Sequence, residues 1–499
     1  MDAVVIGAGP NGLTAAATLA RHGWDVLVLE AKARPGGAVY SEELTIPGYL
    51  HDVGAAFFPF ADDSPAFRSL DLVGAGLRWG NARRESCHPA RDGTVATISR
   101  DVEETVRSFG TDGPAWRHLA DWQRGMGERL AAALLAPLPA IGPAWRLGIG
   151  NLLRMGRRGL LSTRGFSERF FQTEAARRVI PGLALHADLG PDDFAGAGMG
   201  LVLGLLAAHS GFRVPLGGAR AITIALLRRL EEAGGKIRLG TRVQRIRVHE
   251  RRATAVLTEQ GEEIAVRRAV IADVGPPALF LKMLSERETT WWLRTRIRRF
   301  RYAWGTFKMD WALSGPVPWS SDEARESAVL HAGDSLADLT AFTRQVRAGQ
   351  LPNRPYLVIG QQSLIDPGRA PPGGHTLWAY SHIPSVVEGG WERHKESFAD
   401  RVERRLEELA PGFRSLIRGR FIATPADLEA MDENLVGGDL GGGSARWNQQ
   451  LIFRPAFPYF RYRTPIQGLY LASASTHPGP GVHGACGFNA AHTAIRDAR

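Results

Sequence analysis

Three glycines near the start of the chain, Gly7, Gly9 and Gly12, restrict its possible folds more than any other feature. They follow a short apolar, β-branched run at residues 4–6 and precede an alanine-rich amphipathic stretch at residues 13–20. This order predicts a strand, a tight turn and a helix. Gly7 permits the turn, Gly9 lets the backbone approach a pyrophosphate, and Gly12 lets helix and strand pack closely. The start of the helix would then offer unpaired N–H groups and its positive dipole end to phosphates.

A second buried strand is predicted at residues 25–29, and Glu30 follows it directly. An acidic residue at this position accepts hydrogen bonds from the ribose hydroxyls of a bound dinucleotide, and its charge repels a 2′-phosphate. Strand, glycines, helix, strand and terminal acid in this order are a much more specific signal than the glycines alone. They predict a dinucleotide site. A glycine turn without a ligand is the alternative interpretation.

Residues 31–37 distinguish between the possible dinucleotides. Arg34, Gly36 and Gly37 resemble the second phosphate motif of FAD enzymes of the glutathione-reductase type, a motif that NAD dehydrogenases lack. The glycines would bring backbone donors to the pyrophosphate, and Arg34 would add a fork-shaped cation. Residues 51–55 resemble the segment of the same fold that runs beneath the isoalloxazine ring. We therefore expect FAD, and the other cofactor contacts predicted in this region are Pro10, Asn11, Ala31, Ala38, Gly54 and Ala55.

The length of the chain, 499 residues, favours two domains. A second nucleotide-domain block begins at residues 215–218 and continues through a predicted helix at 221–233 and several short strands. No second GxGxxG motif follows, which argues against a separate NAD(P)H domain. We expect an α/β protein, with a glutathione-reductase-like FAD-binding Rossmann domain and an inserted α+β substrate domain, and an active site at their interface. The predicted FAD-binding domain comprises residues 1–85, 215–290 and 465–499, and the substrate domain comprises residues 86–214 and 291–464.

Near the C-terminus, a glycine-rich turn at residues 475–485 precedes a final predicted helix. Together with the N-terminal fingerprint and with residues 366–370, 439–443 and 462–465, this turn resembles the phytoene desaturase-like flavoproteins of the amine oxidase superfamily. The resemblance runs nearly from end to end of the chain.

The resemblance implies further contacts with the cofactor. It places Gly481 and Val482 near the flavin and directs the start of a helix at Gly484 towards the N1 and C2 carbonyl region, where a positive dipole end stabilises the anionic reduced flavin. It also implies that the backbone of Val243 contacts adenine and that the strand ending at Ala272 returns to the nucleotide.

The chain departs from the pattern of this family in the same region. Ser473 and Pro480 stand where the family usually has glycine. We expect Ser473 to lie at the phosphates and to alter the affinity for FAD or its pose. His477 and Cys486 belong to the turn that faces the flavin, so covalent attachment of the flavin is a hypothesis, with ordinary turn packing as the alternative.

The candidate catalytic residues are Lys308, His382 and His209. Residues 304–313 alternate so that Lys308 and Asp310 share a face, and Lys308 is similar in position to the lysine that holds a water at flavin N5 in amine oxidase-type enzymes. A salt bridge between Lys308 and Asp310 on a sheet surface is the alternative. His382 and His209 are candidates for acid–base work because the pKa of histidine lies near neutral pH, with packing or capping as the alternative for both.

Composition and charge limit the other classes of protein to which the chain could belong. Cys87 and Cys486 have no metal-type spacing, so neither a disulfide framework nor a metal site is expected, and a reducing, cytoplasmic location fits best. A strand begins within the first residues, so no signal or transit sequence is expected. The net charge of +10 comes from arginines dispersed among acidic residues, and no nucleic-acid-binding motif accompanies it. Residues 145–161 mix apolar and basic side chains, as in a peripheral membrane contact or, alternatively, a cationic surface loop.

These observations predict an FAD-dependent dehydrogenase or oxidase. It would remove hydride from a C–H bond of a largely apolar small molecule, leave a double bond in the product, and be reoxidised by oxygen or a quinone. A redox-neutral polyene isomerase that uses reduced FAD, and a flavin-binding protein without turnover, are the alternatives. The substrate and the oligomeric state stay open.

Overall fold

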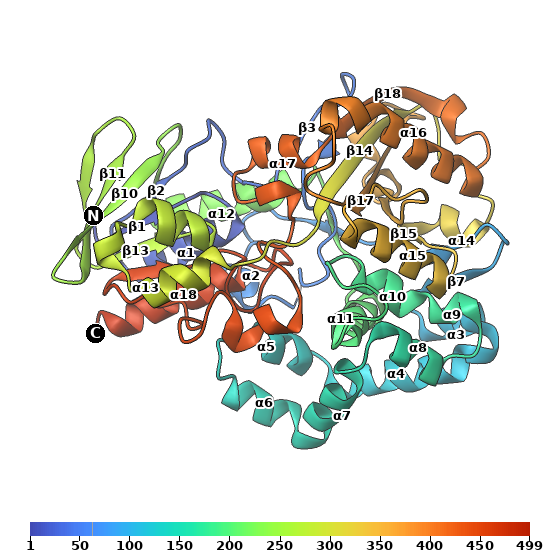
Figure 1. Ribbon diagram of the computed structural model, residues 1–499, viewed down its shortest axis with the longest axis horizontal. Coiled ribbons are helices and arrows are strands. Elements are labelled where there is room, and N and C mark those ends of the chain that lie inside the picture. The colour runs from blue at the N-terminus through green and yellow to red at the C-terminus, as the bar shows by residue number, and fades with distance from the viewer. Residues whose placement is uncertain (62) are drawn as a thin grey trace.

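A five-stranded parallel sheet forms the core of one lobe of the molecule, at the left of Figure 1. The computed structural model describes residues 1–61 and 63–499. The order in this sheet is β19-β13-β1-β2-β9, and every neighbouring pair is parallel. Its strands are β1 (Ala3–Ile6), β2 (Val26–Leu29), β9 (Lys236–Arg238), β13 (Ala269–Ala272) and β19 (Leu469–Leu471).

Both faces of this sheet are covered, which explains why β1, β2 and β13 consist of apolar residues at every position. Val5 and Val28 pack on the side of α1 (Pro10–Arg21), α12 (Arg220–Glu232) and α18 (Ala485–Asp497). Val4 and Leu29 pack on the other side, against an antiparallel sheet of β10 (Val243–His249), β11 (Arg252–Thr258) and β12 (Glu263–Ala265) and against α13 (Trp291–Arg298). The predicted α/β class is therefore confirmed.

A seven-stranded sheet forms the core of the second lobe, at the right of Figure 1, in the order β18-β14-β17-β16-β15-β6-β7. Its neighbouring strands are antiparallel except for β15 and β6. The strands are β6 (Arg84–Pro89), β7 (Val95–Ile98), β14 (Gly305–Leu313), β15 (Ser327–Ala332), β16 (Leu357–Gly360), β17 (His375–Ile383) and β18 (Ile417–Ala423). Strand β6 of this sheet begins at Arg84, two residues before the predicted start of the substrate domain at residue 86. The limits of the two domains stay a prediction.

The alternation predicted for residues 304–313 is present in β14. Phe307, Met309 and Trp311 pack into an apolar core with α16 (Trp391–Leu409). Thr306, Lys308 and Asp310 occupy the opposite face. There are also two short two-stranded sheets: β3 (Ser41–Glu42) with β4 (His51–Asp52), and β5 (Trp79–Gly80) with β8 (Val214–Pro215).

Helices between β7 and β8 pack below the second sheet in Figure 1 and close this lobe. They are α3 (Val102–Phe109), α4 (Gly113–Met126), α5 (Arg129–Leu135), α6 (Ile141–Leu147), α7 (Ile149–Gly159), α8 (Thr163–Phe170), α9 (Glu174–Arg177), α10 (Val179–Ala184) and α11 (Gly196–His209). The remaining helices are α2 (Pro65–Leu70), α14 (Asp322–Arg325), α15 (Leu336–Arg347) and α17 (Pro425–Met431). Over residues 1–61 and 63–499, no helix is both long and apolar enough to cross a bilayer.

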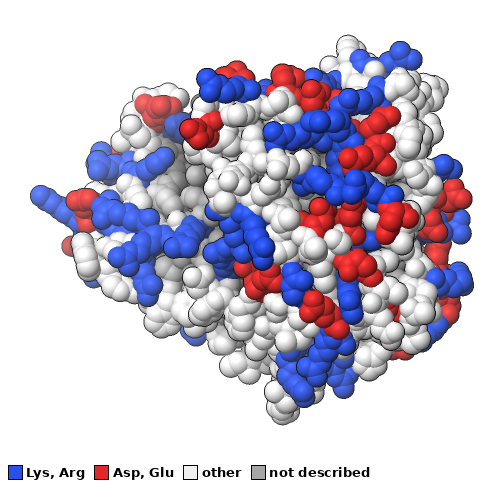
Figure 2. Space-filling model, turned by 45° about the vertical axis from the view of Figure 1, so that its right-hand side comes forward, with Lys and Arg blue, Asp and Glu red and all other residues white. Residues whose placement is uncertain are grey.

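The interpretation of residues 145–161 as a cationic surface loop is wrong. These residues contain the end of α6 and the whole of α7. Gly150 and Gly156 cost helix stability, but a helix sorts the side chains of this segment into apolar and basic faces, which outweighs the low glycine propensity. Basic and acidic side chains are interspersed on the right of the face shown in Figure 2, whereas basic side chains predominate on its left.

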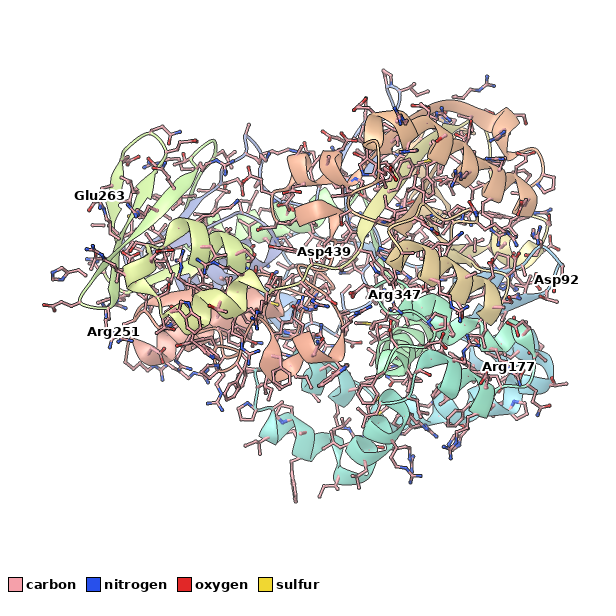
Figure 3. All side chains as sticks on the ribbon, in the orientation of Figure 1. Asp92, Arg177, Arg251, Glu263, Arg347 and Asp439 are labelled. Carbon is pink, nitrogen blue, oxygen red and sulfur yellow. The ribbon has the colours of Figure 1, made fainter. Side chains whose placement is uncertain are left out.

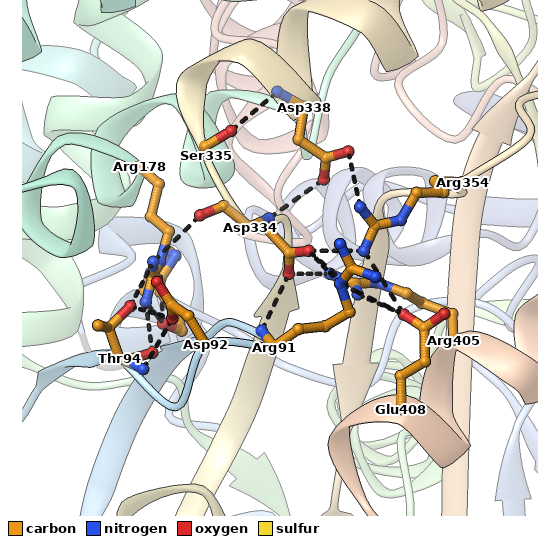
Figure 4. A network of polar contacts seen from close by, with 11 residues as sticks. Arg91, Asp92, Thr94, Arg178, Asp334, Ser335, Asp338, Arg354, Arg405 and Glu408 are labelled. Carbon is orange, nitrogen blue, oxygen red and sulfur yellow. Dashed lines mark hydrogen bonds and ion pairs between the residues drawn. The ribbon is translucent and has the colours of Figure 1, made fainter.

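An ion-pair network fixes the far side of the second lobe (Figure 4). Asp334, in the connection after β15, contacts the guanidinium groups of Arg91, Arg354 and Arg405. Burial alone would raise the pKa of Asp334, but hydrogen bonds and charges from Arg405 and Arg354 outweigh it and hold this pKa at about 2. The network therefore ties the β6–β7 turn to α16.

The lowered pKa predicts how the stability of this lobe depends on pH. Since the folded-state pKa of Asp334 lies below its ordinary value of 3.8, the stabilisation is present above that value and is lost as the pH falls towards 2. Asp334→Asn should lower the free energy of unfolding at pH 7 by about 2 kcal/mol. Urea unfolding should show a smaller difference from wild type at pH 3. Asp322→Asn, on an exposed ion pair, should change neither value, and an equal loss in both variants would contradict the assignment.

Candidate functional site

The glycine turn between β1 and α1 has the geometry that its sequence predicts. Gly7 has a φ of +96°, which favours glycine, and a Cβ on Gly12 would lie 2.1 Å from the carbonyl oxygen of Gly7. Gly9 caps α1, and Pro10 begins it, where the missing N–H of proline is harmless. Gly9, Pro10 and Asn11 keep part of their surface accessible at the start of the helix. A ligand phosphate can therefore approach this turn.

Glu30 is held beside the turn by backbone donors. Its Oε2 accepts from Ala8 N at 2.7 Å, and its Oε1 accepts from Lys32 N at 2.8 Å. The N–H of Thr241 donates to the Glu30 carbonyl oxygen, which places the start of β10, and hence the predicted adenine contact Val243, next to this acid. Each carboxylate oxygen keeps a further lone pair for a ribose hydroxyl.

The second glycine motif packs directly on the first. Gly36 N donates to Ala8 O at 2.9 Å, and a Cβ on Gly37 would lie 3.5 Å from the Cα of Gly9. Gly36 and Gly37 have φ values of +113° and +53°. The two motifs therefore form one cradle, whose remaining neighbours, Ala31, Ala38, Gly54 and Ala55, are all partly accessible.

Arg34 carries a donor that the protein leaves without a hydrogen bond. Its guanidinium lies over the ring of Tyr40, and Nη1 is 3.5 Å from Glu42 Oε1, but over the described part of the chain this buried nitrogen has no hydrogen-bond acceptor. A phosphate oxygen is a suitable acceptor for it. The donor set therefore fits the pyrophosphate of FAD.

The C-terminal turn reaches the same cradle from the other end of the chain. A Cβ on Gly487 in α18 would lie 1.9 Å from Asn11 O, and a Cβ on Gly484 would lie 2.6 Å from Thr14 Oγ1. The N-termini of α1 and α18 therefore lie side by side. Gly481 has a φ of +135° and Val482 a φ of +49°. A β-branched residue such as Val482 is strained at a positive φ, and backbone strain of this kind is typical of functional turns.

Ser473 is buried and organises its own turn, since its carbonyl oxygen accepts from the N–H and hydroxyl of Thr476. Next to it, the fully buried Arg454 donates to Ala474 O and to carbonyl oxygens of the 441–444 loop. Asp439, between the two lobes in Figure 3, accepts from the N–H groups of Gly441 and Gly443 in that loop. The sequence motif 439–443 thus serves to hold the C-terminal turn, a role that sequence reasoning did not assign.

Neither residue considered for covalent attachment is poised for it. The buried thiol of Cys486 donates to the carbonyl oxygens of Thr476 and Gly479, and burial raises its pKa to about 11. His477 contacts Ala136 O, and burial lowers its pKa to about 4. Nucleophilic attack requires the thiolate, so the geometry favours ordinary packing, and covalent flavin stays a hypothesis.

Lys308 lies on the face of β14 that looks towards the FAD-binding lobe. It is buried and paired with Asp310, whose Oδ1 is 3.6 Å from His51 Nδ1 in β4. The alternative of a Lys308–Asp310 salt bridge is therefore present, but buried at the junction of the lobes and not on a sheet surface. Burial raises the pKa of Asp310 to about 6 against the opposing charge of Lys308. A role for Lys308 at the flavin stays a prediction.

His382 lies opposite Thr306 in the β14–β17 pair. Both its ring nitrogens and Thr306 Oγ1 are buried and make no hydrogen bond of good geometry among the described residues, although backbone groups of His186, Gly305 and Leu185 lie close to the imidazole. Burial lowers the pKa of His382, with the Asp188 charge acting in the opposite direction. His209, the other histidine considered, is the last residue of α11.

A buried chain of hydrogen-bonding groups reaches the same face and was not predicted. Tyr380 Oη is 3.3 Å from His186 Nδ1, His186 Nε2 is 2.7 Å from His331 Nε2, and His331 Nδ1 and His88 Nε2 are each 3.1 Å from Ser86 Oγ. Burial lowers the pKa of all three histidines, so the rings are neutral and each can donate at one nitrogen and accept at the other. Because β6, β15, β17 and the turn after α10 supply these residues, no local sequence pattern predicts them.

Comparisons with known proteins agree with this geometry. Residues 11–491 match the family described as flavin containing amine oxidoreductase. Pyridine nucleotide-disulfide oxidoreductase domain-containing protein 2 of Rattus norvegicus is 29% identical, over 99% of this chain and 93% of its own. A neurosporene-forming phytoene desaturase of Rhodobacter capsulatus is 26% identical over 96% and 91%, and an all-trans-zeta-carotene desaturase of Myxococcus xanthus is 25% identical over 96% and 90%.

Solved structures share the fold at lower identity. An oxidoreductase from Methanosarcina mazei superposes with a TM-score of 0.65 at 17% identity, covering 99% of this chain and 100% of its own. A putrescine oxidase triple mutant superposes with a TM-score of 0.63 at 16% identity, covering 99% and 98%. The FAD-binding fold and FAD as the cofactor are thereby confirmed.

The close contact between the two glycine motifs predicts the effect of a single methyl group. In Gly37→Ala the new Cβ would lie 2.9 Å from Asp432 Oδ2, so the Asp432 carboxylate must shift, and alanine would have to adopt a strained φ of +53° inside the cradle. We expect the Kd for FAD to rise at least about tenfold, which corresponds to 1.4 kcal/mol, measured by flavin fluorescence on reconstitution of the apoprotein. Gly150→Ala, on the exposed surface of α7 with no atom within 4 Å, is the matched control and should bind FAD like wild type. Unchanged affinity in Gly37→Ala would contradict the assigned cradle.

Proposed function

Because the chain belongs to the flavin-containing amine oxidoreductase family and is an FAD-dependent oxidoreductase, we propose that it dehydrogenates a largely apolar small molecule. Hydride leaves a C–H bond of the substrate, and loss of a proton from the neighbouring carbon leaves a double bond. Bound FAD supplies the ring that accepts the hydride. Oxygen or a quinone then takes up the electrons.

The observation that carries this proposal is the character of the β14–β17 face. Trp378 and Tyr380 stack at 5.6 Å, and Phe57, two residues beyond the predicted flavin segment, lies 6.0 Å from Trp378. Aromatic side chains directly beside the cofactor segment suit an apolar substrate. Asp310 on this face is already paired with Lys308, so it leaves no free counter-charge for a substrate ammonium group.

Residues of this face would position the substrate and move its proton. The strand register places Lys308 directly opposite Tyr380. Tyr380, backed by His186, can accept or donate a hydrogen bond, depending on the direction of the histidine chain. Lys308 and His382 are the residues that we propose to act next to the reacting atoms.

Anaerobic bleaching of the flavin spectrum tests both the reaction and Lys308. Wild-type protein mixed with a panel of terpenoids, amines and biosynthetic intermediates should lose its oxidised flavin absorbance with a member of the apolar class. With that compound, Lys308→Met should slow bleaching or reoxidation at least about tenfold, or 1.4 kcal/mol in activation free energy. Lys308→Met combined with Asp310→Asn removes the orphaned buried charge and should be equally slow.

The other outcomes of this experiment are distinct. Full speed in both variants would remove Lys308 from the mechanism. Product formation without net bleaching or acceptor consumption would indicate an isomerase. Flavin that stays oxidised with the whole panel would favour a flavin-binding protein without turnover.

We also propose that the protein lies on the cytoplasmic face of a membrane and takes its substrate there. Helices α6 and α7 project at the lower edge of the molecule in Figure 1. Ile141, Trp145 and Leu153 are 73%, 74% and 64% exposed, and Arg154 and Arg157 are exposed beside them. Exposed apolar side chains bordered by cations suit an anionic bilayer surface.

Sedimentation with phosphatidylglycerol vesicles checks this surface. Wild-type protein should pellet with them and stay in solution with phosphatidylcholine vesicles, because the arginines add electrostatic attraction. Replacing Arg146, Arg154 and Arg157 by Gln should abolish pelleting. Replacing Arg245, Arg247 and Arg251 by Gln, at the opposite lobe, removes the same charge and should leave it intact. Equal losses of pelleting in the two triple variants would show that net charge alone, and not the surface of α6 and α7, causes the binding.

A further inference from the structure

Asp273 follows β13 directly, and its carboxylate lies inside the glycine turn. Oδ2 accepts from Gly12 N at 2.7 Å, and a Cβ on Gly9 would lie 2.9 Å from the same oxygen. The side chain is almost completely buried. It therefore occupies the N-terminus of α1, where unpaired N–H groups receive the phosphates of a dinucleotide.

The charges around Asp273 are mostly negative. Glu30, at the end of β2, and Asp432, after α17, both face it, and Cys486 of α18 lies close by as a neutral thiol. Over the described residues, none of these three carboxylates has a Lys or Arg partner at ion-pair distance. The nearby Lys32 directs its Nζ to Ala430 O. Burial, then Asp432 and Glu30, raise the pKa of Asp273 to about 8, although the Gly12 N–H acts in the opposite direction.

Binding FAD adds two further negative charges to this cradle. A carboxylate directly beside a pyrophosphate is repelled, and the low local dielectric makes the repulsion stronger than in water. A neutral carboxylic acid has no such penalty, because it keeps an oxygen that accepts from Gly12 N and gains an O–H donor. The same position can therefore obstruct or assist the cofactor, depending on one proton.

We propose that Asp273 binds FAD as the neutral carboxylic acid and donates its O–H to a pyrophosphate oxygen, so that binding takes up one proton from solvent wherever free Asp273 is ionised. The uptake changes no other bond, and the flavin keeps its oxidation state. The inference depends on FAD binding alone, so failure of the proposed dehydrogenation would leave it intact.

The sign of the pH dependence follows from linkage. The anionic pyrophosphate raises the pKa of Asp273 further in the complex. Below about pH 8 the acid is neutral in both states and the affinity is independent of pH. Above it the free protein loses the proton that the complex keeps, so the Kd for FAD should rise about tenfold per pH unit.

The experiment uses full-length apoprotein and FAD. Fluorescence titrations from roughly pH 6.5 to 9.5 give the Kd, and calorimetry at about pH 9 in two buffers of different ionisation enthalpy gives the number of protons taken up. The expected result is a flat profile followed by a tenfold weakening per unit, with about one proton bound per FAD at pH 9. A flat profile throughout, or no proton uptake, would overturn the proposal.

Two variants separate Asp273 from its neighbours. Asp273→Asn keeps an acceptor for Gly12 N and a donor for the phosphate, and should bind FAD tightly without the slope. Asp432→Asn removes a charge that accepts nothing from the glycine turn, and should keep the slope at a slightly lower pH. The same slope in Asp273→Asn and its loss in Asp432→Asn would assign the proton to Asp432 and overturn the proposal. If Asp273→Asn does not fold, as judged by circular dichroism, the wild-type proton count still decides.

Discussion

The close approach of backbone to backbone at the start of α1 is the constraint on which the rest of this molecule depends. The turn after β1 leaves no room for a side chain at Gly12, and α18 comes so near to Asn11 that Gly487 cannot carry one either. Residues from the two ends of the chain therefore meet within one turn of helix. This contact aligns two helix N-termini next to each other, which concentrates unpaired N–H groups and positive dipole ends at the cofactor cradle.

The two lobes are joined by charged groups that water cannot reach. His51 of β4, which is neutral because burial lowers its pKa to about 3, lies 3.6 Å from Asp310 of β14, and the adjacent Asp52 accepts from the guanidinium of Arg369 across the same junction. Removing one partner from such a pair leaves a buried charge without compensation, which is much more costly than losing a surface ion pair. Arg454 acts in the same way on the C-terminal turn, which it ties to the 441–444 loop. The position of the substrate face relative to the cofactor thus depends on a few polar contacts.

The molecule contains buried polar groups that are fully hydrogen-bonded and others that have no hydrogen-bond partner. Structural polar groups such as Arg178, which donates to His88 O and Thr94 O, have all the partners they need. Arg34 Nη1, Thr306 Oγ1 and the His382 ring nitrogens do not, within the part of the chain that the structure describes. A buried polar atom without a partner costs about 1–3 kcal/mol, and a ligand that supplies the partner removes this cost. Arg34 lies at the predicted phosphate motif, and Thr306 and His382 lie on the face beside the flavin segment, whereas other atoms of this kind, such as Trp116 Nε1 and Ser167 Oγ, lie among the helices of the second lobe.

The sequence by itself determined the parallel sheet with its glycine turn, the FAD motif and the alternation in β14, because these depend on residues close together in the chain and on backbone conformations that only glycine tolerates. It could not determine the helical state of residues 149–159, where the amphipathic arrangement of the side chains overrides the low propensity of three glycines. Only the tertiary structure brought Asp273 into the turn at Gly12, joined His88, Ser86, His331 and His186 to Tyr380, and assigned Arg454 to the C-terminal turn. Each of these contacts joins residues distant in sequence, and their chemistry arises from mutual burial, which no local pattern encodes.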